Sequence, residues 1–139
     1  HQIGGGFAQY HFVLVAAQTF QQQRITRHWL TRRTYRLAQS RHRARLGRDA
    51  KLKHVVVTFG GDVVRITPDA EFEAEGGEVE MLGLYFADSD QHQEHRLFVD
   101  HSVPNCRSRV TYKGALQGEG AHAVWVGDVL IQAAASGTD

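Results

Sequence analysis

Apolar and polar residues alternate along most of the chain after residue 50, with the period of two that is typical of β-strands. The alternation is strictest from Ala70 to Glu75, where acids occupy one face and small or aromatic residues the other. Similar runs cover residues 55–59, 63–67, 78–86, 96–101, 109–116 and 122–132. No helical period is visible after residue 50, so the pattern predicts an all-β unit.

Turn signals separate these predicted strands. They lie at Gly60-Gly61-Asp62, Pro68-Asp69, Gly76-Gly77, residues 102–105 and residues 118–120. Asn-Gly and Asp-Gly, the usual two-residue hairpin turns, are absent from the sequence. A sandwich, a closed barrel and a parallel β-solenoid all remain open, and the glycine-rich corners favour the solenoid although their spacing is irregular.

The first third of the chain has a different pattern. Residues 12–17 predict one short strand, but residues 19–45 are rich in Gln and Arg, and their apolar residues are too sparse for a helical stripe. We therefore expect residues 1–45 to form a basic segment that is irregular or partly helical. Residues 46–139 are expected to form the β-domain.

Charge is divided unevenly between the two parts. Residues 1–53 contain eleven of the sixteen Lys and Arg and a single acid, Asp49, whereas the remainder contains five bases and fourteen acids. Such asymmetry can mark an arm that binds nucleic acid or another acidic partner, here the Arg-rich run 24–53. The alternative is that the opposite charges meet within one assembly.

Length and cysteine content set further bounds. A chain of 139 residues suffices for one domain, and Cys106 has no possible intramolecular disulfide partner, so we expect a reducing compartment, the cytoplasm. No apolar run is long enough to predict a membrane span. The chain begins without Met and ends soon after a strand-like run, so we expect a fragment of a longer protein.

Three histidines and the cysteine are candidate metal ligands: His92, His95, His101 and Cys106. On an extended strand, His92 and His95 would face opposite ways, whereas His95 and His101 would share a face. We therefore favour a structural role for them and assign no metal site. A buried thiol is likewise favoured over a reactive one for Cys106.

Two other motifs carry little chemistry. Neighbouring strand residues such as Asp100, His101 and Ser102 face opposite ways, so they do not form a catalytic relay. The glycine-rich stretches lack the Gly-Lys-Ser/Thr ending of a phosphate loop, so we expect no ATP binding by this chain.

An ordered set of residues between Leu84 and Gly114 resembles the SufD family of the SUF iron-sulfur cluster assembly system. The set begins with Leu84-Tyr85 and Val99, and its signature residues are Gln91, His92, His95, Asp100, His101, Pro104, Cys106, Ser108, Tyr112, Lys113 and Gly114. The paralogous SufB family shares the Gln-His region but typically lacks the Val-Asp-His and Tyr-Lys-Gly elements. The resemblance covers roughly the last hundred residues and weakens toward the N-terminus.

This resemblance implies a right-handed parallel β-helix core that acts as a scaffold and not as an enzyme. Its implied partners are a SufB-like paralogue and a SufC-like ATPase, which it contacts mostly through regions beyond residue 139. The iron-sulfur cluster would be the product of the complex, and no cofactor would be bound by this chain alone. We expect no membrane association and no nucleic-acid partner.

Two rival hypotheses remain open from the residues themselves. One is a nucleic-acid-binding module that uses the Arg-rich run, although only Trp29 and Tyr35 are available there for base stacking. The other is a metal-dependent β-solenoid or cupin-like enzyme that uses the histidines.

Overall fold

The computed structural model describes residues 10–17, 24–32 and 35–139, with side chains from residue 37 onward. This part of the chain contains strands and no helix, and therefore no helix able to cross a membrane. The strands are β1 (Tyr10–Ala17), β2 (Arg24–Arg32), β3 (Tyr35–Leu46), β4 (Lys51–Phe59), β5 (Val63–Phe72), β6 (Glu78–Asp88), β7 (His92–His101), β8 (Arg107–Gln117) and β9 (His122–Ile131).

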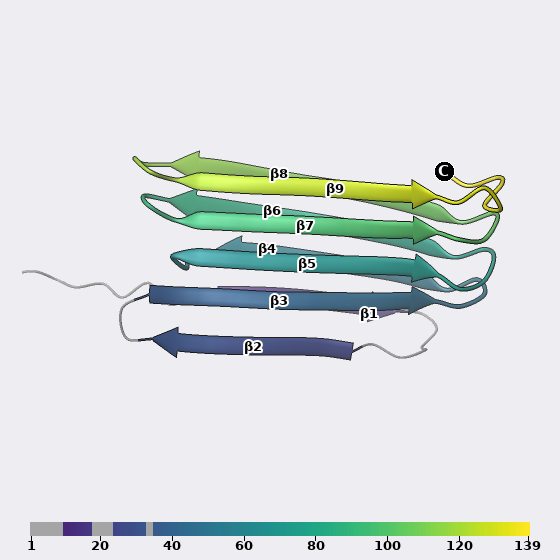
Figure 1. The fold of residues 1–139 in the computed structure, drawn as a ribbon, viewed down its shortest axis with the longest axis horizontal. Helices are drawn as coiled ribbons and strands as arrows, with labels where there is room; N and C mark the ends of the chain where they lie inside the picture. The colour runs from purple at the N-terminus through teal and green to yellow at the C-terminus, as the bar shows by residue number, and fades with distance from the viewer. Residues whose placement is uncertain (1–9, 18–23, 33–34) are drawn as a thin grey trace, which may run out of the picture.

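The strands form two facing sheets, and from β3 onward the chain alternates between them (Figure 1). One sheet has the order β1-β4-β6-β8 and the other β2-β3-β5-β7-β9. From β3 to β9, neighbours within each sheet are parallel, whereas β1 and β2 pair antiparallel with β4 and β3. Figure 1 shows that the path from front strand to back strand and up to the next level is right-handed. The predicted right-handed parallel β-solenoid is confirmed.

Each turn of the solenoid places a residue beside its equivalent in the next turn. Leu37 pairs with Val63, Val63 with His92 and His92 with His122, which are steps of 26, 29 and 30 residues. The step varies because the corners differ in length while the paired strands keep their register. This variation explains why the sequence shows no strict repeat.

Alternate residues of both sheets point into the space between them and form the core. On β4 and β5 every second residue is buried, which is the pattern that a two-layer solenoid requires. One cluster contains Leu46, Ala50, Leu52, Ala70, Phe72, Val79, Met81, Leu97, Val99 and Cys106, and a second contains Ala38, Val56, Val64 and Ile66. On β8 and β9, the last described strands, the apolar side chains are more exposed, and Trp125 is 44% exposed.

The corners stack as regularly as the strands. Asp49 and Gly76 occupy equivalent corners one turn apart, and both have a positive φ, 54° and 76°. The Asp49 amide donates to the Glu75 carbonyl at 3.0 Å, and the Asp49 carboxylate fills the space that a β-carbon at Gly76 would need. Asp90 and Gly120 repeat this arrangement at the opposite end of the strands. These corners therefore depend on glycine for both conformation and space.

Two expectations about local structure are wrong. The described residues of the basic N-terminal segment form strands, not irregular or helical structure, because Arg41, Arg43 and Arg45 alternate with inward-facing residues along β3. The turn expected at Pro68 is also absent, since β5 continues to Phe72. The ladder from β5 to β7 has no pairs at Thr67 and Pro68, so a residue without an N–H is accommodated there.

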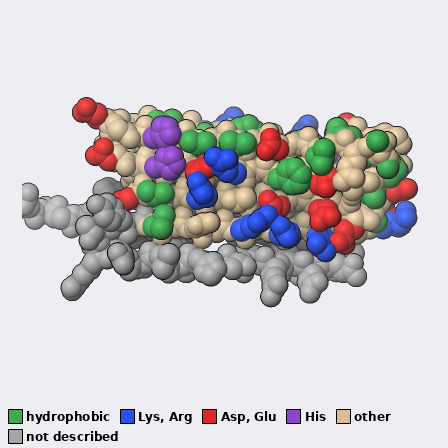
Figure 2. Space-filling model, viewed as in Figure 1, with side chains coloured by type: hydrophobic (Ala, Val, Ile, Leu, Met, Phe, Trp, Pro, Cys, Tyr) green, Lys and Arg blue, Asp and Glu red, His purple; other side chains and the backbone are tan. Residues whose placement is uncertain are grey.

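Ion pairs connect the basic first turn to the acidic second turn. Arg41 and Arg43 bind Asp69, Arg45 binds Glu71 and Glu73, and Lys51 and Lys53 bind Glu78 and Glu80. Figure 2 shows red and blue side chains side by side on one outer face. The uneven charge of the sequence is therefore largely balanced between neighbouring turns in the described part of the chain.

We predict that Asp69→Asn lowers the free energy of unfolding by about 1–2 kcal/mol, between the usual ranges for exposed and buried pairs. The Asp69 side chain is 12% exposed and is bound by two atoms of Arg41, Nε at 2.8 Å and Nη2 at 2.7 Å. Urea denaturation measures the change. Glu73→Gln is the matched control, since this exposed pair should contribute less than about 0.5 kcal/mol. Equal losses in both variants would contradict the prediction.

Candidate functional site

The predicted signature residues from Gln91 to Gly114 lie in one continuous part of the solenoid: β7, the following corner and most of β8. Gln91 precedes β7, and its side-chain oxygen accepts a hydrogen bond from the Asp88 amide at 2.9 Å. His95 and His101 point into the interior, whereas His92 lies on the outer face. The strand alternation predicted from the sequence is therefore confirmed for these three histidines.

His95 is the centre of an interior cluster of rings. It is 1% exposed, its Nε2 shares a 3.1 Å hydrogen bond with Thr58 Oγ1, and its ring stacks on Tyr85 at 4.9 Å between centroids. The ring centroid of Tyr112 lies 5.8 Å from that of His95 and 5.9 Å from that of Trp125. The cluster links both sheets across three turns of the solenoid.

Two glycines make room for the tyrosines of this cluster. Gly83 pairs with Tyr112, and Tyr85 pairs with Gly114, on the neighbouring strands β6 and β8. A β-carbon at Gly83 would overlap the Tyr112 ring, and one at Gly114 would overlap the Tyr85 ring. The Tyr112-Lys113-Gly114 element of the signature is therefore explained by packing, with Lys113 exposed on the outer face.

Burial sets the protonation of Tyr112. The phenol oxygen is buried and has no hydrogen-bond partner among the described residues, and burial raises its pKa to about 12. The phenol therefore stays neutral at physiological pH.

The second half of the signature surrounds the corner that connects β7 to β8. His101 is buried, packs against Phe72 with 4.7 Å between ring centroids, and shares a 2.9 Å hydrogen bond with Ser108 Oγ. Cys106 is 2% exposed, and its thiol donates to the carbonyls of Pro104 at 3.4 Å and Ala74 at 3.7 Å. This geometry is that of a buried structural thiol.

The four metal-ligand candidates of the sequence do not converge. His92 is on the outer face, and the interior His95 and His101 are six positions apart, which corresponds to roughly 20 Å along a strand. The described residues contain no group of three or more His, Cys, Asp or Glu side chains placed to hold a metal ion. The structure therefore brings no three of these four together.

Asp100, His101 and Ser102 also serve separate partners. Asp100 accepts hydrogen bonds from Gln132 Nε2 at 2.9 and 3.1 Å, whereas Ser102 Oγ donates to the Phe72 carbonyl. His101 bonds Ser108 instead of either neighbour. The three adjacent residues form no relay, as expected from strand geometry.

Sequence reasoning missed a buried histidine pair. His42 Nδ1 lies 3.0 Å from His54 Nε2 on the facing sheet, and both side chains are buried. Burial is the main reason that the pKa of His54 is lowered to about 4, and the nearby His42 lowers it further. Burial likewise lowers the pKa of His101. The two histidines are 12 residues apart on facing strands joined by one corner, and no local pattern in the sequence signals that they meet.

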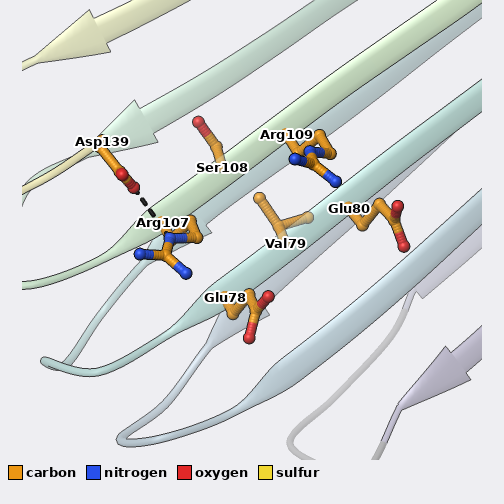
Figure 3. Close-up of a pocket in the computed structure, with 7 residues that line it drawn as sticks. All are labelled: Glu78, Val79, Glu80, Arg107, Ser108, Arg109 and Asp139. Carbon is orange, nitrogen blue, oxygen red and sulfur yellow. Dashed lines mark hydrogen bonds and ion pairs between the residues drawn. The ribbon is translucent and has the colours of Figure 1, made fainter.

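A groove of about 570 Å³ lies along β6 and β8 (Figure 3). Acidic and basic side chains from neighbouring strands line it, and Arg107 donates to Asp139 at 2.9 Å. The lining residues are Glu78, Val79, Glu80, Arg107, Ser108, Arg109 and Asp139. The alternating charges do not concentrate a field of one sign, so the groove has no evident preference for an ion.

The fold and these contacts define a class: a parallel β-solenoid whose signature residues stabilise stacked turns. The chain matches the family described as "SUF system FeS cluster assembly, SufBD core domain" over residues 13–139. It therefore belongs to the SufBD family of the SUF iron-sulfur cluster assembly system. This is the family level of the predicted resemblance, and it is confirmed.

Mycobacterial proteins named "Iron-sulfur cluster assembly SufBD family protein" are similar to this chain. Those of Mycobacterium tuberculosis and Mycobacterium bovis are 58% identical over 106 residues, and that of Mycobacterium leprae is 57% identical over the same length. Each alignment covers 72% of this chain, which spans only 27% of the relative's length. No solved structure matches the chain significantly.

We predict that Gly83→Ala lowers the free energy of unfolding by about 1–3 kcal/mol, the usual effect of overpacking a core. In a Tyr112→Leu background the same change should cost much less, because the overlapping ring is gone. Urea denaturation of the four proteins of this double-mutant cycle measures the coupling. Strictly additive effects would contradict the assigned contact.

A second prediction concerns acid stability. The folded-state pKa of His54, about 4, lies below its ordinary value of 6.5, so its neutral form favours folding above pH 6.5. That contribution, about 3 kcal/mol at most, is lost as the pH falls from 6.5 to 4, and His101 acts in the same direction. Unfolding in urea at several pH values should show the loss.

His54→Gln should flatten this pH dependence, so that wild type and variant converge in stability near pH 4. Lys113→Gln, which removes an exposed charge on β8, serves as the control and should keep the wild-type slope. An unchanged slope in His54→Gln would show that this pair does not determine the acid response.

Proposed function

We propose that this protein is a SufD-type, non-enzymatic scaffold subunit of the SUF assembly complex. It acts with a SufB-like paralogue and a SufC-like ATPase in the cytoplasm. The iron-sulfur cluster is the product of the complex and is not a resident cofactor of this chain alone. The observation that carries the proposal is the SufBD family match over residues 13–139, together with the parallel solenoid that these residues form.

The contacts of the signature residues support a scaffold role. His95, His101, Cys106 and Tyr112 are all engaged in packing or hydrogen bonding within the solenoid, and none opens toward the described groove. Residues with such roles maintain a rigid framework and are not exposed to a substrate. The structure built by the signature is therefore suited to positioning partners.

The assignment to the SufD type depends on two elements of the signature. In the first element, Val99 lies in the core, Asp100 accepts a hydrogen bond from Gln132, and His101 is hydrogen-bonded to Ser108. Tyr112-Lys113-Gly114 supplies the reciprocal packing with Gly83 and Tyr85. Both elements are typical of SufD and not of SufB, so we favour the SufD type.

The ion pairs argue against a nucleic-acid-binding function. Phosphate recognition requires basic side chains that are available to the phosphates. Arg41, Arg43, Arg45, Lys51 and Lys53 are each within ion-pair distance of an acid from the next turn. Binding DNA through them would first require these pairs to be broken.

Co-expression tests the proposal. The tagged full-length protein, with the regions beyond residue 139, is purified at moderate salt together with SufB and SufC homologues from the same organism, and we expect all three to elute as one complex that supports cluster reconstitution. The Arg41→Gln/Arg43→Gln variant should form the same complex. A protein that fails to co-purify with both homologues would contradict the proposal.

The same preparation tests the nucleic-acid hypothesis. We expect no retention of duplex DNA at moderate salt by either protein. Retention by the wild type that is lost in Arg41→Gln/Arg43→Gln, with no co-purification of the homologues, would favour the basic-arm function instead.

A further inference from the structure

Two histidines form an isolated pair on the outer face of the second sheet. His92 on β7 and His122 on β9 occupy the same register position, at the start of their strands. Figure 2 shows two histidine side chains side by side on this face. The side chain of His92 is 34% exposed, and His122 is exposed, so solvent reaches the pair.

The two rings present nitrogen atoms to each other. The Nδ1 atoms are 2.8 Å apart, and the rings are nearly parallel, with centroids at 4.9 Å and an angle of 21° between planes. The backbone fixes both positions, because the His92 amide donates to the Asp62 carbonyl and the His122 amide to the Gln91 carbonyl. The pair is therefore held by the ladder and the corners of two successive turns.

A carboxylate lies on the other side of the His92 ring. Glu94 Oε2 is 3.8 Å from His92 Nε2, and the Glu94 side chain is held by Arg65 at 2.7 Å and by Arg96. Nε2 of His92 therefore faces this carboxylate, and Nδ1 faces His122.

We propose that His92 and His122 form a two-histidine site for a divalent transition-metal ion of the zinc, nickel or copper type. Imidazole nitrogen suits these ions, whereas magnesium and calcium prefer oxygen ligands. A tetrahedral ion with bonds of 2.0–2.1 Å holds two nitrogens roughly 3.3 Å apart, so the two Nδ1 atoms need to move apart by about half an ångström and the rings need to turn toward the ion. The proton that the two Nδ1 atoms share at 2.8 Å is displaced, and each imidazole then carries its proton on Nε2. Water fills the remaining coordination positions.

The neighbouring charges permit a cation here. Arg65 and Arg96 both bind the Glu94 carboxylate, which offsets part of their repulsion, and they lie on the Nε2 side of His92. The site differs from the four candidates of the sequence, because only His92 belongs to both sets. Strand pairing, not sequence proximity, supplies its second ligand from thirty residues away.

Metal titration of the purified protein tests the inference. Isothermal titration calorimetry with Zn²⁺ is carried out on the wild type, His92→Gln, His122→Gln and the exposed control Lys113→Gln, with Mg²⁺ as the control ion. We expect one Zn²⁺ site that is present in the wild type and in Lys113→Gln, and that is weakened at least about tenfold in either histidine variant. Mg²⁺ should not bind at this site.

Electron paramagnetic resonance with Cu²⁺ provides a second measurement. The wild type should show coupling to two imidazole nitrogens, and each single variant should show coupling to one. Circular dichroism confirms that the variants are folded, as expected for substitutions on an outer face. Zn²⁺ affinity that is unchanged in both histidine variants, or absent from the wild type, would overturn the proposal. Neither result bears on co-purification with the SUF homologues.

Discussion

The register between successive turns is the constraint on which the rest of this structure depends. Every strand from β5 to β7 is paired on both sides by strands of neighbouring turns, so each outward or inward side chain stacks on equivalents above and below. A slip of one residue would move a whole strand's buried set to the outside. Interior rings, outer ion pairs and the histidine pair all follow from this single alignment.

The interior is unusual in how many polar side chains it contains. Gln93, Thr58 and His95 are fully or almost fully buried. Thr58 bonds His95, and the Gln93 amide donates to the Phe86 carbonyl at 2.7 Å. Because a buried polar group without a partner is costly, such bonds select one register over its alternatives. The polar interior therefore contributes to specificity as well as to stability.

The sequence predicted the strands and most corners after residue 50, because alternation and glycine turns are local signals. It did not predict β3, because the inward positions of this strand include Ala38, Ser40 and His42 and give no hydrophobic stripe. Its outward arginines are matched only by acids of the next turn, which the local sequence does not show. It also predicted a turn at Pro68. The structure shows instead that β5 and β7 are not paired at this position, so that a residue without an N–H fits in the strand. His122 could not be linked to His92 without the step of thirty residues, which depends on corner length.

The stacked corners have a consequence for how this chain can vary. The carboxylate of Asp49 occupies the space beside Gly76, the carboxylate of Asp90 that beside Gly120, and the Asn105 amide oxygen that beside Gly137. A larger residue at any of these glycines needs both a permissive backbone and a smaller residue one turn away. The two residues of each pair are therefore coupled, and in homologous sequences a substitution at one should accompany a substitution at the other. The sequence separation of two positions that change together would then give the number of residues in one turn.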